Sequence, residues 1–423
     1  MVAAPLTTAA AVAAPVHPWV GALLAGLPDP AGLRPESVLA AQAALAAAGL
    51  PSRRQEDWRF TDTTPITAVD PRLLEPGAPA PLPPVAEGHQ RVVLDGRAES
   101  LEGIAWPEGI EPLGDEEAQA VLGRCLGTAA AKESDWPVLV NSAMSPAVLG
   151  LRVRGAVAPV LELVSDAGEA QGVLPLRVVL LLEPEARLEL LQVHLSGGAN
   201  LTSVVVGAEL TSGAELRHGV VATGAAGSVL LARLAIRQAP GSRWSLATVS
   251  RGWGLVRLEP RVVQSEGEAE TRLRSLQLVD GQQIADTHSR VRFDGPGGQL
   301  EQLHKVVADG QGRSVFNGAV VVPRAAQRTD ASQLSRSLLL SDRARVDTKP
   351  ELEIVADDVR CAHGATVSRL QEDELFYLRS RGIGAAEAAR LLLRGYCQEI
   401  LGELPAAAAI WQAPSFSAGP ETP

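Results

Sequence analysis

A unit made of a turn followed by an apolar residue recurs at a regular interval in this chain. Its copies end at Leu188, Leu216, Trp244 and Leu300, so the intervals are 28, 28 and 56 residues, the last being twice 28. A degenerate copy, Glu266–Thr271, lies near the missing position. Such spacing among short Val- and Leu-rich runs predicts a β-solenoid, in which each turn buries its inward side chains on its neighbours. A β-sandwich whose turns share this spacing by coincidence is the alternative.

The residue composition and the apolar periodicity change along the chain and predict five regions. Residues 36–48 have a helical pattern that Gly49 and Pro51 end, and six prolines within residues 71–84 indicate a linker. From Gln371 onward the apolar period becomes helical again, with a second helix expected over 385–404. The expected regions are an N-terminal helical region (1–70), a Pro-rich linker and variable segment (71–136), a β-helix core (137–367), a C-terminal helical domain (368–404) and a flexible tail (405–423).

Composition excludes several classes of protein. The 423 residues carry 38 basic and 49 acidic side chains, a net charge of -11, and aromatic residues make up 3%. Nucleic-acid binding needs basic surfaces and base-stacking aromatics, so we expect no nucleic-acid partner. Charged or polar residues interrupt every long apolar run, so no membrane span is expected. The first 33 residues lack Lys and Arg, which argues against a secretory signal or transit peptide.

The cysteines and lysines narrow the chemistry further. Three cysteines (Cys125, Cys361 and Cys397) cannot build a disulfide framework and suit a reducing compartment, and they cannot supply four thiolates to an iron–sulfur cluster. We expect a cytoplasmic chain, or a plastid stromal one if it is a mature organellar protein. A phosphate-binding loop needs Gly-Lys followed by Ser or Thr, and no lysine here follows glycine, so no bound nucleotide is expected.

The densest group of metal-ligating residue types is Cys361 and His363. In a strand their Cα atoms would lie ~6.6 Å apart with parallel side chains, an arrangement that could share a soft metal such as iron. The alternative is a buried cysteine beside a hydrogen-bonded histidine, which is the more frequent case for an isolated pair. His288 and His304 are weaker candidates, and His304 alternates with apolar neighbours as an ordinary strand residue does.

Several linked motifs resemble the SufB/SufD family of iron–sulfur cluster assembly scaffolds. The segment Pro51–Trp58 is similar to the entry motif of that family, and Cys361–Thr366 and Leu375–Ile383 are similar to its C-terminal motifs. The other matching segments are Val315–Gly318, Ala326–Ala331, Leu338–Ser341, Lys349–Ile354 and Asp357–Val359. So many motifs in order are specific, and they favour a ligand role for the Cys361 and His363 pair. The low cysteine count and the length resemble the SufD branch more than the SufB branch.

The resemblance implies a right-handed parallel β-helix between helical ends, and a non-enzymatic scaffold that works with a SufB-like subunit and a SufC-like ATPase. It implies that the β-helix contact between the two scaffold chains holds a transient cluster or iron, with His363, accompanied by Cys361, as the candidate ligand. It also implies that the C-terminal helices bind the ATPase. The candidate residues for that contact are Leu375, Phe376, Tyr377, Arg379, Arg381, Gly382 and Leu393.

Two other functions stay open at this point. One is a free-standing β-solenoid enzyme of the polysaccharide lyase or acyltransferase type, with His288 or His304 as the base. The other is a family member that has lost metal chemistry and only rigidifies a complex.

Overall fold

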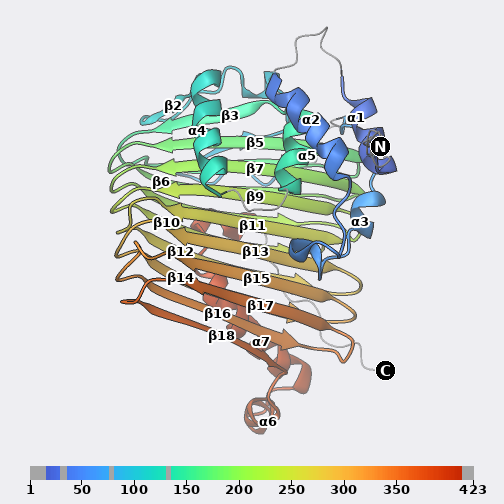
Figure 1. Cartoon of the computed structure of the whole chain (residues 1–423). Coiled ribbons are helices and arrows are strands. Elements are labelled where there is room, and N and C mark those ends of the chain that lie inside the picture. Colours follow the sequence, from blue (N-terminus) through green and yellow to red (C-terminus); the bar gives the residue numbers. More distant parts are fainter. Residues whose placement is uncertain (1–15, 29–35, 76–80, 130–134, 412–423) are drawn as a thin grey trace, which may run out of the picture.

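The computed structural model describes residues 16–28, 36–75, 81–129 and 135–411, and two long sheets dominate it (Figure 1). Sheet A contains β2 (Ile110–Pro112), β3 (Val148–Val153), β5 (Gly172–Leu182), β7 (Asn200–Leu210), β9 (Val229–Gln238), β11 (Leu255–Gln264), β13 (Ile284–Phe293), β15 (Arg313–Val322) and β17 (Arg345–Ile354). Sheet B contains β1 (His89–Val93), β4 (Val160–Asp166), β6 (Arg187–Leu195), β8 (Glu215–Thr223), β10 (Arg243–Arg251), β12 (Glu270–Val279), β14 (Gln299–Ala308), β16 (Asp330–Leu339) and β18 (Arg360–Ser368).

From β3 to β18 the chain alternates between the sheets, so each turn contributes one strand to sheet A and one to sheet B. Neighbouring turns pair in parallel, and β2 adds an antiparallel strand beside β3. The chain is therefore a parallel β-solenoid, as the sequence spacing predicts.

The 28-residue spacing corresponds to one register position on sheet B. Leu188, Leu216, Trp244, Thr271 and Leu300 are direct neighbours on successive strands, so the degenerate copy ending at Thr271 fills the missing place. All five side chains are buried inside the solenoid. We call this position the first inward row, and it continues through Ala331 to Cys361.

A second inward row lies two residues further along each strand and mixes apolar with polar side chains. Its members are Leu190, His218, Leu246, Leu273, Gln302, Gln333 and His363. His218 is buried and its Nε2 lies 2.8 Å from the Gln192 Oε1 atom. Buried polar groups need such partners, so the interior of the solenoid is hydrogen-bonded as well as apolar.

One backbone position is left-handed in successive turns before the sheet B strands. Gly213, Gly241 and Gly297 have φ of 68°, 74° and 71°, and Glu268 and Arg328 occupy the equivalent place at 50° and 60°. The N–H of this residue donates to a carbonyl of the next turn, for example Gly241 to Glu268 at 2.8 Å. The turn shape is therefore set by stacking on the next turn, and non-glycine residues there carry a steric cost.

A helical layer covers the outer face of sheet A (Figure 1). It comprises α1 (Pro18–Gly26), α2 (Glu36–Ala48), η1 (Glu56–Trp58), α3 (Thr64–Thr67), α4 (Asp115–Ala129) and α5 (Trp136–Met144). Trp19, Trp58 and Trp136 pack together there, with ring centroids 6.3 and 6.0 Å apart, although they are scattered in the sequence. The expected linker and variable segment, 71–136, contains β1, η2 (Glu99–Leu101), β2 and α4 in its described part.

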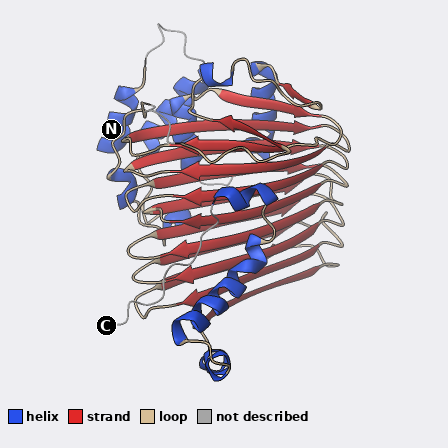
Figure 2. Ribbon diagram, turned by 180° about the vertical axis from the view of Figure 1, so that it is seen from behind, coloured by secondary structure: helices blue, strands red, loops and turns tan. Residues whose placement is uncertain are grey.

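The C-terminal helices α6 (Glu372–Ser380), α7 (Ala385–Leu401) and η3 (Ala406–Trp411) follow β18, and the view from behind shows the longest of them lying across sheet B (Figure 2). Residues from 405 were expected to form a flexible tail. The structure instead buries Ala407, Ala408 and Trp411 against sheet B, and residues 412–423 lie outside the described part of the chain. None of the described helices is both long and apolar enough to span a membrane.

Candidate functional site

The last turn of the solenoid is the part whose inward side chains are not covered by a following turn. In sheet A, β17 pairs with β15, and in sheet B, β18 pairs with β16, so each forms the end of its sheet. Most side chains of β18 are exposed, whereas those of the middle strands are buried. Within the described residues, the solenoid therefore ends in two strand edges with free hydrogen-bonding groups.

Cys361 and His363 lie on β18, as the resemblance implies, and they continue the first and second inward rows. Cys361 packs partly against the interior core, while His363 is exposed because no further turn covers it. Burial and the nearby Asp330 carboxylate raise the pKa of the Cys361 thiol, and a hydrogen bond with the Ala331 backbone acts in the opposite direction. The thiol is therefore protonated at neutral pH in the chain alone.

This pair does not form a complete metal site by itself. Across the described ranges, no three His, Cys, Asp or Glu side chains are grouped so that they could hold one ion. A cluster or iron held at Cys361 and His363 would need further ligands from outside this group.

The C-terminal helices differ in how they pack. In α7, Leu393 and Cys397 are buried against sheet B, and the Lys305 ammonium donates to the Tyr396 carbonyl at 2.7 Å, so α7 is anchored firmly. Burial raises the pKa of the Cys397 thiol to about 12.

No side chain of α6, by contrast, is buried. Phe376 is 71% exposed and Tyr377 is 57% exposed, and the Arg381 guanidinium lies 5.3 Å from the Tyr377 ring centroid. Gly382 ends the helix at φ 88°, where the N–H of Ile383 donates to the Leu378 carbonyl in a Schellman arrangement. Leu375, Arg379 and Arg381 belong to the same projecting segment, whereas the candidate Leu393 holds α7 in place.

The two histidines considered as bases are inaccessible. His304 is fully buried, stacks on Phe316 with centroids 4.5 Å apart, and lies 2.6 Å through Nδ1 from the Ser275 hydroxyl. Burial lowers its pKa to about 3. His288 is also buried, on the outer face of sheet A beside Asp286. Neither imidazole reaches a surface where a polysaccharide could bind, which disfavours the solenoid-enzyme function.

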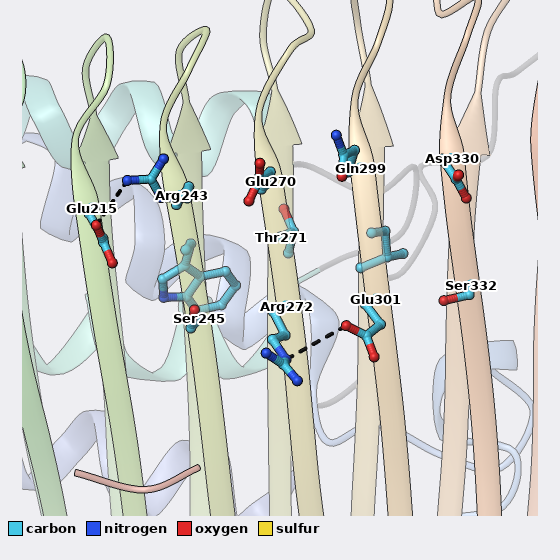
Figure 3. A pocket seen from close by; sticks show the side chains of 12 residues that line it. Glu215, Arg243, Ser245, Glu270, Thr271, Arg272, Gln299, Glu301, Asp330 and Ser332 are labelled. Carbon is cyan, nitrogen blue, oxygen red and sulfur yellow. Dashed lines mark hydrogen bonds and ion pairs between the residues drawn. The ribbon is translucent and has the colours of Figure 1, made fainter.

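A shallow groove of about 410 Å³ lies on sheet B beside the turns (Figure 3). Its two arginines pair with acids across neighbouring strands: Arg243 donates to Glu215 at 3.1 Å, and Arg272 lies 3.7 Å from Glu301. Exposed ion pairs of this kind contribute little free energy, and with four carboxylates against two arginines the groove is a solvated, net acidic sheet surface.

A buried ionic network joins the N-terminal layer to sheet A, and sequence reasoning missed it. Arg257 donates to Asp286 at 2.6 Å and stacks over Trp58 at 4.0 Å, while Arg233 donates to Glu259 at 3.0 Å. Burial alone would raise the pKa of Glu259. The Arg233 and Arg257 guanidinium groups nevertheless hold it well below its usual range. Charged residues within the predicted strands were the only sign of this network in the sequence, and their partners are distant in sequence. The network ties the Pro51–Trp58 segment to the solenoid.

The chain is thus a parallel β-solenoid with an open last turn, helix α7 packed on sheet B, and helix α6 without buried side chains. The family model described as SUF system FeS cluster assembly, SufBD core domain, matches residues 164–396, which is more than half of the chain. The chain belongs to the SufBD family of the SUF iron–sulfur cluster assembly system.

Similar proteins come from bacteria and from a plant. An iron–sulfur cluster assembly SufBD family protein of Synechocystis is 45% identical over 177 residues, 42% of this chain and 39% of the relative. The chloroplastic protein ABCI7 of Arabidopsis thaliana is 39% identical over 205 residues, 48% and 43% of the two chains. The SufD protein of Escherichia coli is 40% identical over 138 residues, which are 32% of this chain and 33% of the relative. The matched stretches thus cover less than half of each relative.

Proposed function

We propose that this chain is a SufD-type scaffold subunit that pairs with a SufB-like chain and a SufC-like ATPase to build and transfer nascent iron–sulfur clusters. Its own role is not catalytic, and ATP hydrolysis belongs to the partner. Membership of the SufBD family and the similarity to the E. coli SufD protein support the proposal. The single observation that carries it is the uncovered last turn with Cys361 and His363 on its edge strand.

The proposed pairing with the SufB-like chain uses the free edges of β17 and β18. A strand edge with unpaired N–H and C=O groups is a template for another strand, and a second β-helix could continue both sheets. Such a contact would cover the exposed inward rows of the last turn, and it would bring the partner's side chains next to His363.

In this proposal the iron or nascent cluster is cargo shared between the two chains. His363 offers an exposed imidazole, a common ligand for iron, and Cys361 offers a thiol two residues away. Because the pKa of the thiol is raised, Cys361 becomes a ligand only when metal binding displaces its proton, so loading would release protons. This chain supplies at most these two ligands, and the SufB-like chain supplies the rest.

The proposed ATPase contact uses α6 and the turn that follows it. The exposed Phe376 and Tyr377 rings project from a helix that makes no buried contact with the solenoid, as an interface anchor does before its partner binds. Leu393 contributes indirectly, because it anchors α7 on sheet B and α6 is connected to α7. Movement of the ATPase would then be transmitted through α7 to sheet B.

Co-expression of the tagged chain with SufB- and SufC-like partners from the same source tests the assembly. We expect a stable mixed complex on size exclusion, and we expect Phe376→Ser with Tyr377→Ser to release the ATPase while the SufB-like chain stays bound. Leu39→Ser, at an exposed leucine of the N-terminal layer, is the control and should leave the complex intact. A chain that elutes alone while the two partners associate with each other would refute the proposal.

Cluster assembly on the purified complex tests the ligand role. We expect His363→Ala to abolish maturation of a recipient protein while the complex still forms, with Thr366→Ala, exposed on the same strand, as the control. Normal maturation with His363→Ala would remove the ligand role. If Cys361→Ser combined with His363→Ala also has no effect, the chain only rigidifies the complex.

A further inference from the structure

A cavity of about 730 Å³ lies between sheet A and the helices α2, α4 and α5. Its size falls within the range of about 300 to 1,000 Å³ that is typical of small-molecule sites. Apolar side chains form most of its wall: Val38 and Ala41 on α2, Leu122 and Leu126 on α4, Leu139 on α5, and the segment Pro146–Val148. Such a wall suits the apolar body of a ligand.

Among the described side chains that line this cavity, Arg177 on β5 is the one cation. Its Nε and Nη2 donate to the Asn141 Oδ1 atom at 3.1 and 2.9 Å, and Nη2 also donates to the Ser142 hydroxyl at 3.1 Å. Both acceptors are neutral. No described carboxylate forms an ion pair with this guanidinium, and burial lowers the pKa of Arg177 to about 10.

Two buried arginines on the same sheet are paired with acids. Arg233 faces Glu259, and Arg257 faces both Glu259 and Asp286. Removing a charge from water without a counter-ion is costly, so a half-buried guanidinium such as Arg177, which meets only an amide and a hydroxyl, has spare capacity for an anion. A guanidinium is also suited to bidentate binding of a carboxylate or phosphate.

We propose that this cavity binds an organic anion with an apolar body, a carboxylate or a phosphate ester, whose head group lies on Arg177. The apolar wall covers the body of the ligand. Glu102 and Asp115 also line the cavity, but both are exposed and neither pairs with Arg177, so they border the solvent side. The site lies on the outer face of sheet A, away from the last turn, and does not depend on the proposed function.

Two substitutions test the two halves of the site. Arg177→Gln removes the charge and keeps hydrogen-bonding capacity. Gly123→Leu fills the cavity from α4: a Cβ at Gly123 meets no atom within 4 Å, and leucine is a better helix former than glycine, so the fold should persist. Arg154→Gln is the control, because Arg154 is a half-exposed arginine that pairs with Glu111 and does not line the cavity.

The measurement is calorimetric titration of the full chain with decanoate, decyl phosphate, decanol and inorganic phosphate, each below its aggregation concentration. We expect saturable binding of decanoate or decyl phosphate, at least tenfold weaker binding by Arg177→Gln, no binding by Gly123→Leu, and unchanged binding by Arg154→Gln. Thermal melts confirm that each variant is folded.

Three results with the parent chain would overturn the proposal. They are no saturable binding of either decyl anion to the parent chain, equal affinity for decanol, and equal affinity for inorganic phosphate. The second result would indicate an apolar pocket only, and the third an anion site only. Affinity that survives both Arg177→Gln and Gly123→Leu would place binding elsewhere on the chain.

Discussion

Trp244 and Cys361 occupy the same inward position in two turns of the solenoid, one in the middle of the stack and one at its end. Trp244 is 1% exposed because turns lie on both sides of it, whereas Cys361 is covered on one side only. The second inward row repeats the contrast, with His218 buried and His363 exposed. In a solenoid, burial thus depends on the next turn as much as on the residue, and the end turn is where side chains stay available to a partner.

The largest expected difference between the two regions is in the cost of losing an inward side chain. Trp244→Ala should lower the free energy of unfolding by about 3 to 5 kcal/mol, since it leaves a cavity enclosed by neighbouring turns. Cys361→Ala should cost less than about 1 kcal/mol, because a partly exposed small side chain buries little area. Denaturant unfolding of both variants measures the difference. Similar losses would contradict the view that the last turn is uncovered, and size exclusion would then reveal whether chains associate end to end.

The next difference concerns pH and the second inward row. Burial lowers the pKa of His218 to about 3, whereas in the unfolded chain it is near 6.5. Between these values the unfolded chain binds a proton that the folded chain excludes, so stability falls as pH falls, by about 1.4 kcal/mol per pH unit. Between pH 6 and pH 4, His218→Gln should reduce the slope of the unfolding free energy against pH by about that amount, while the buried His194 and His304 keep a slope of the same sign. Glutamine already occupies this row at Gln302 and Gln333.

The matched control for this prediction is His363→Gln, in the same row of the last turn. Its unfolding free energy should keep the pH dependence of the parent chain, measured by urea denaturation at pH 6.5, 5.5 and 4.5. If His363→Gln reduces the pH dependence of the unfolding free energy as much as His218→Gln does, then the last turn is as enclosed as the middle turns.

The smallest expected effects concern the left-handed turn position. Gly241→Ala should destabilise the chain by about 1 kcal/mol, because alanine is strained at a φ of 74°. No steric clash adds to this cost, since the nearest atom to an added Cβ is 3.5 Å away. Glu268→Gly should stabilise it by up to about 1 kcal/mol by relieving the same strain at φ 50°. Thermal and denaturant unfolding measure both.

Arg328→Gly extends this test to the turn beside the end of the stack. Arg328 has φ of 60° and donates its N–H to Asp358 of the last turn. A gain in unfolding free energy equal to that of Glu268→Gly would mean that the last turn holds its backbone as firmly as the middle turns do. A smaller gain would mean that the end turn relaxes when nothing stacks on it.

Local signals in the sequence predicted much of the fold. The 28-residue spacing predicted the solenoid, and its members proved to be direct neighbours on sheet B, including the degenerate Thr271 copy. The helix expected over 36–48 is α2, with the same bounds. These predictions succeeded because turn chemistry and apolar period act over a few residues, and a stacked repeat copies the same local solution in every turn.

Contacts between distant segments escaped prediction. The cluster of Trp19, Trp58 and Trp136, the pairing of Arg257 with Asp286, and the cavity around Arg177 join residues that are tens to hundreds of positions apart. No local pattern records such neighbours. Of the candidate site, the sequence identified Cys361 and His363 as a pair on one strand, but not that they continue two inward rows.

The amino-acid sequence by itself determined the repeat, its turns and the helical ends, because these follow from residue spacing and backbone preference. Only the tertiary structure decided which equivalent positions are buried and which are open. Trp244 and Cys361 satisfy the same local rule, and they differ because one has a turn on each side and the other lies at the end of the stack. That difference arises from the number of turns above and below a residue, which is a property of the whole assembly of strands.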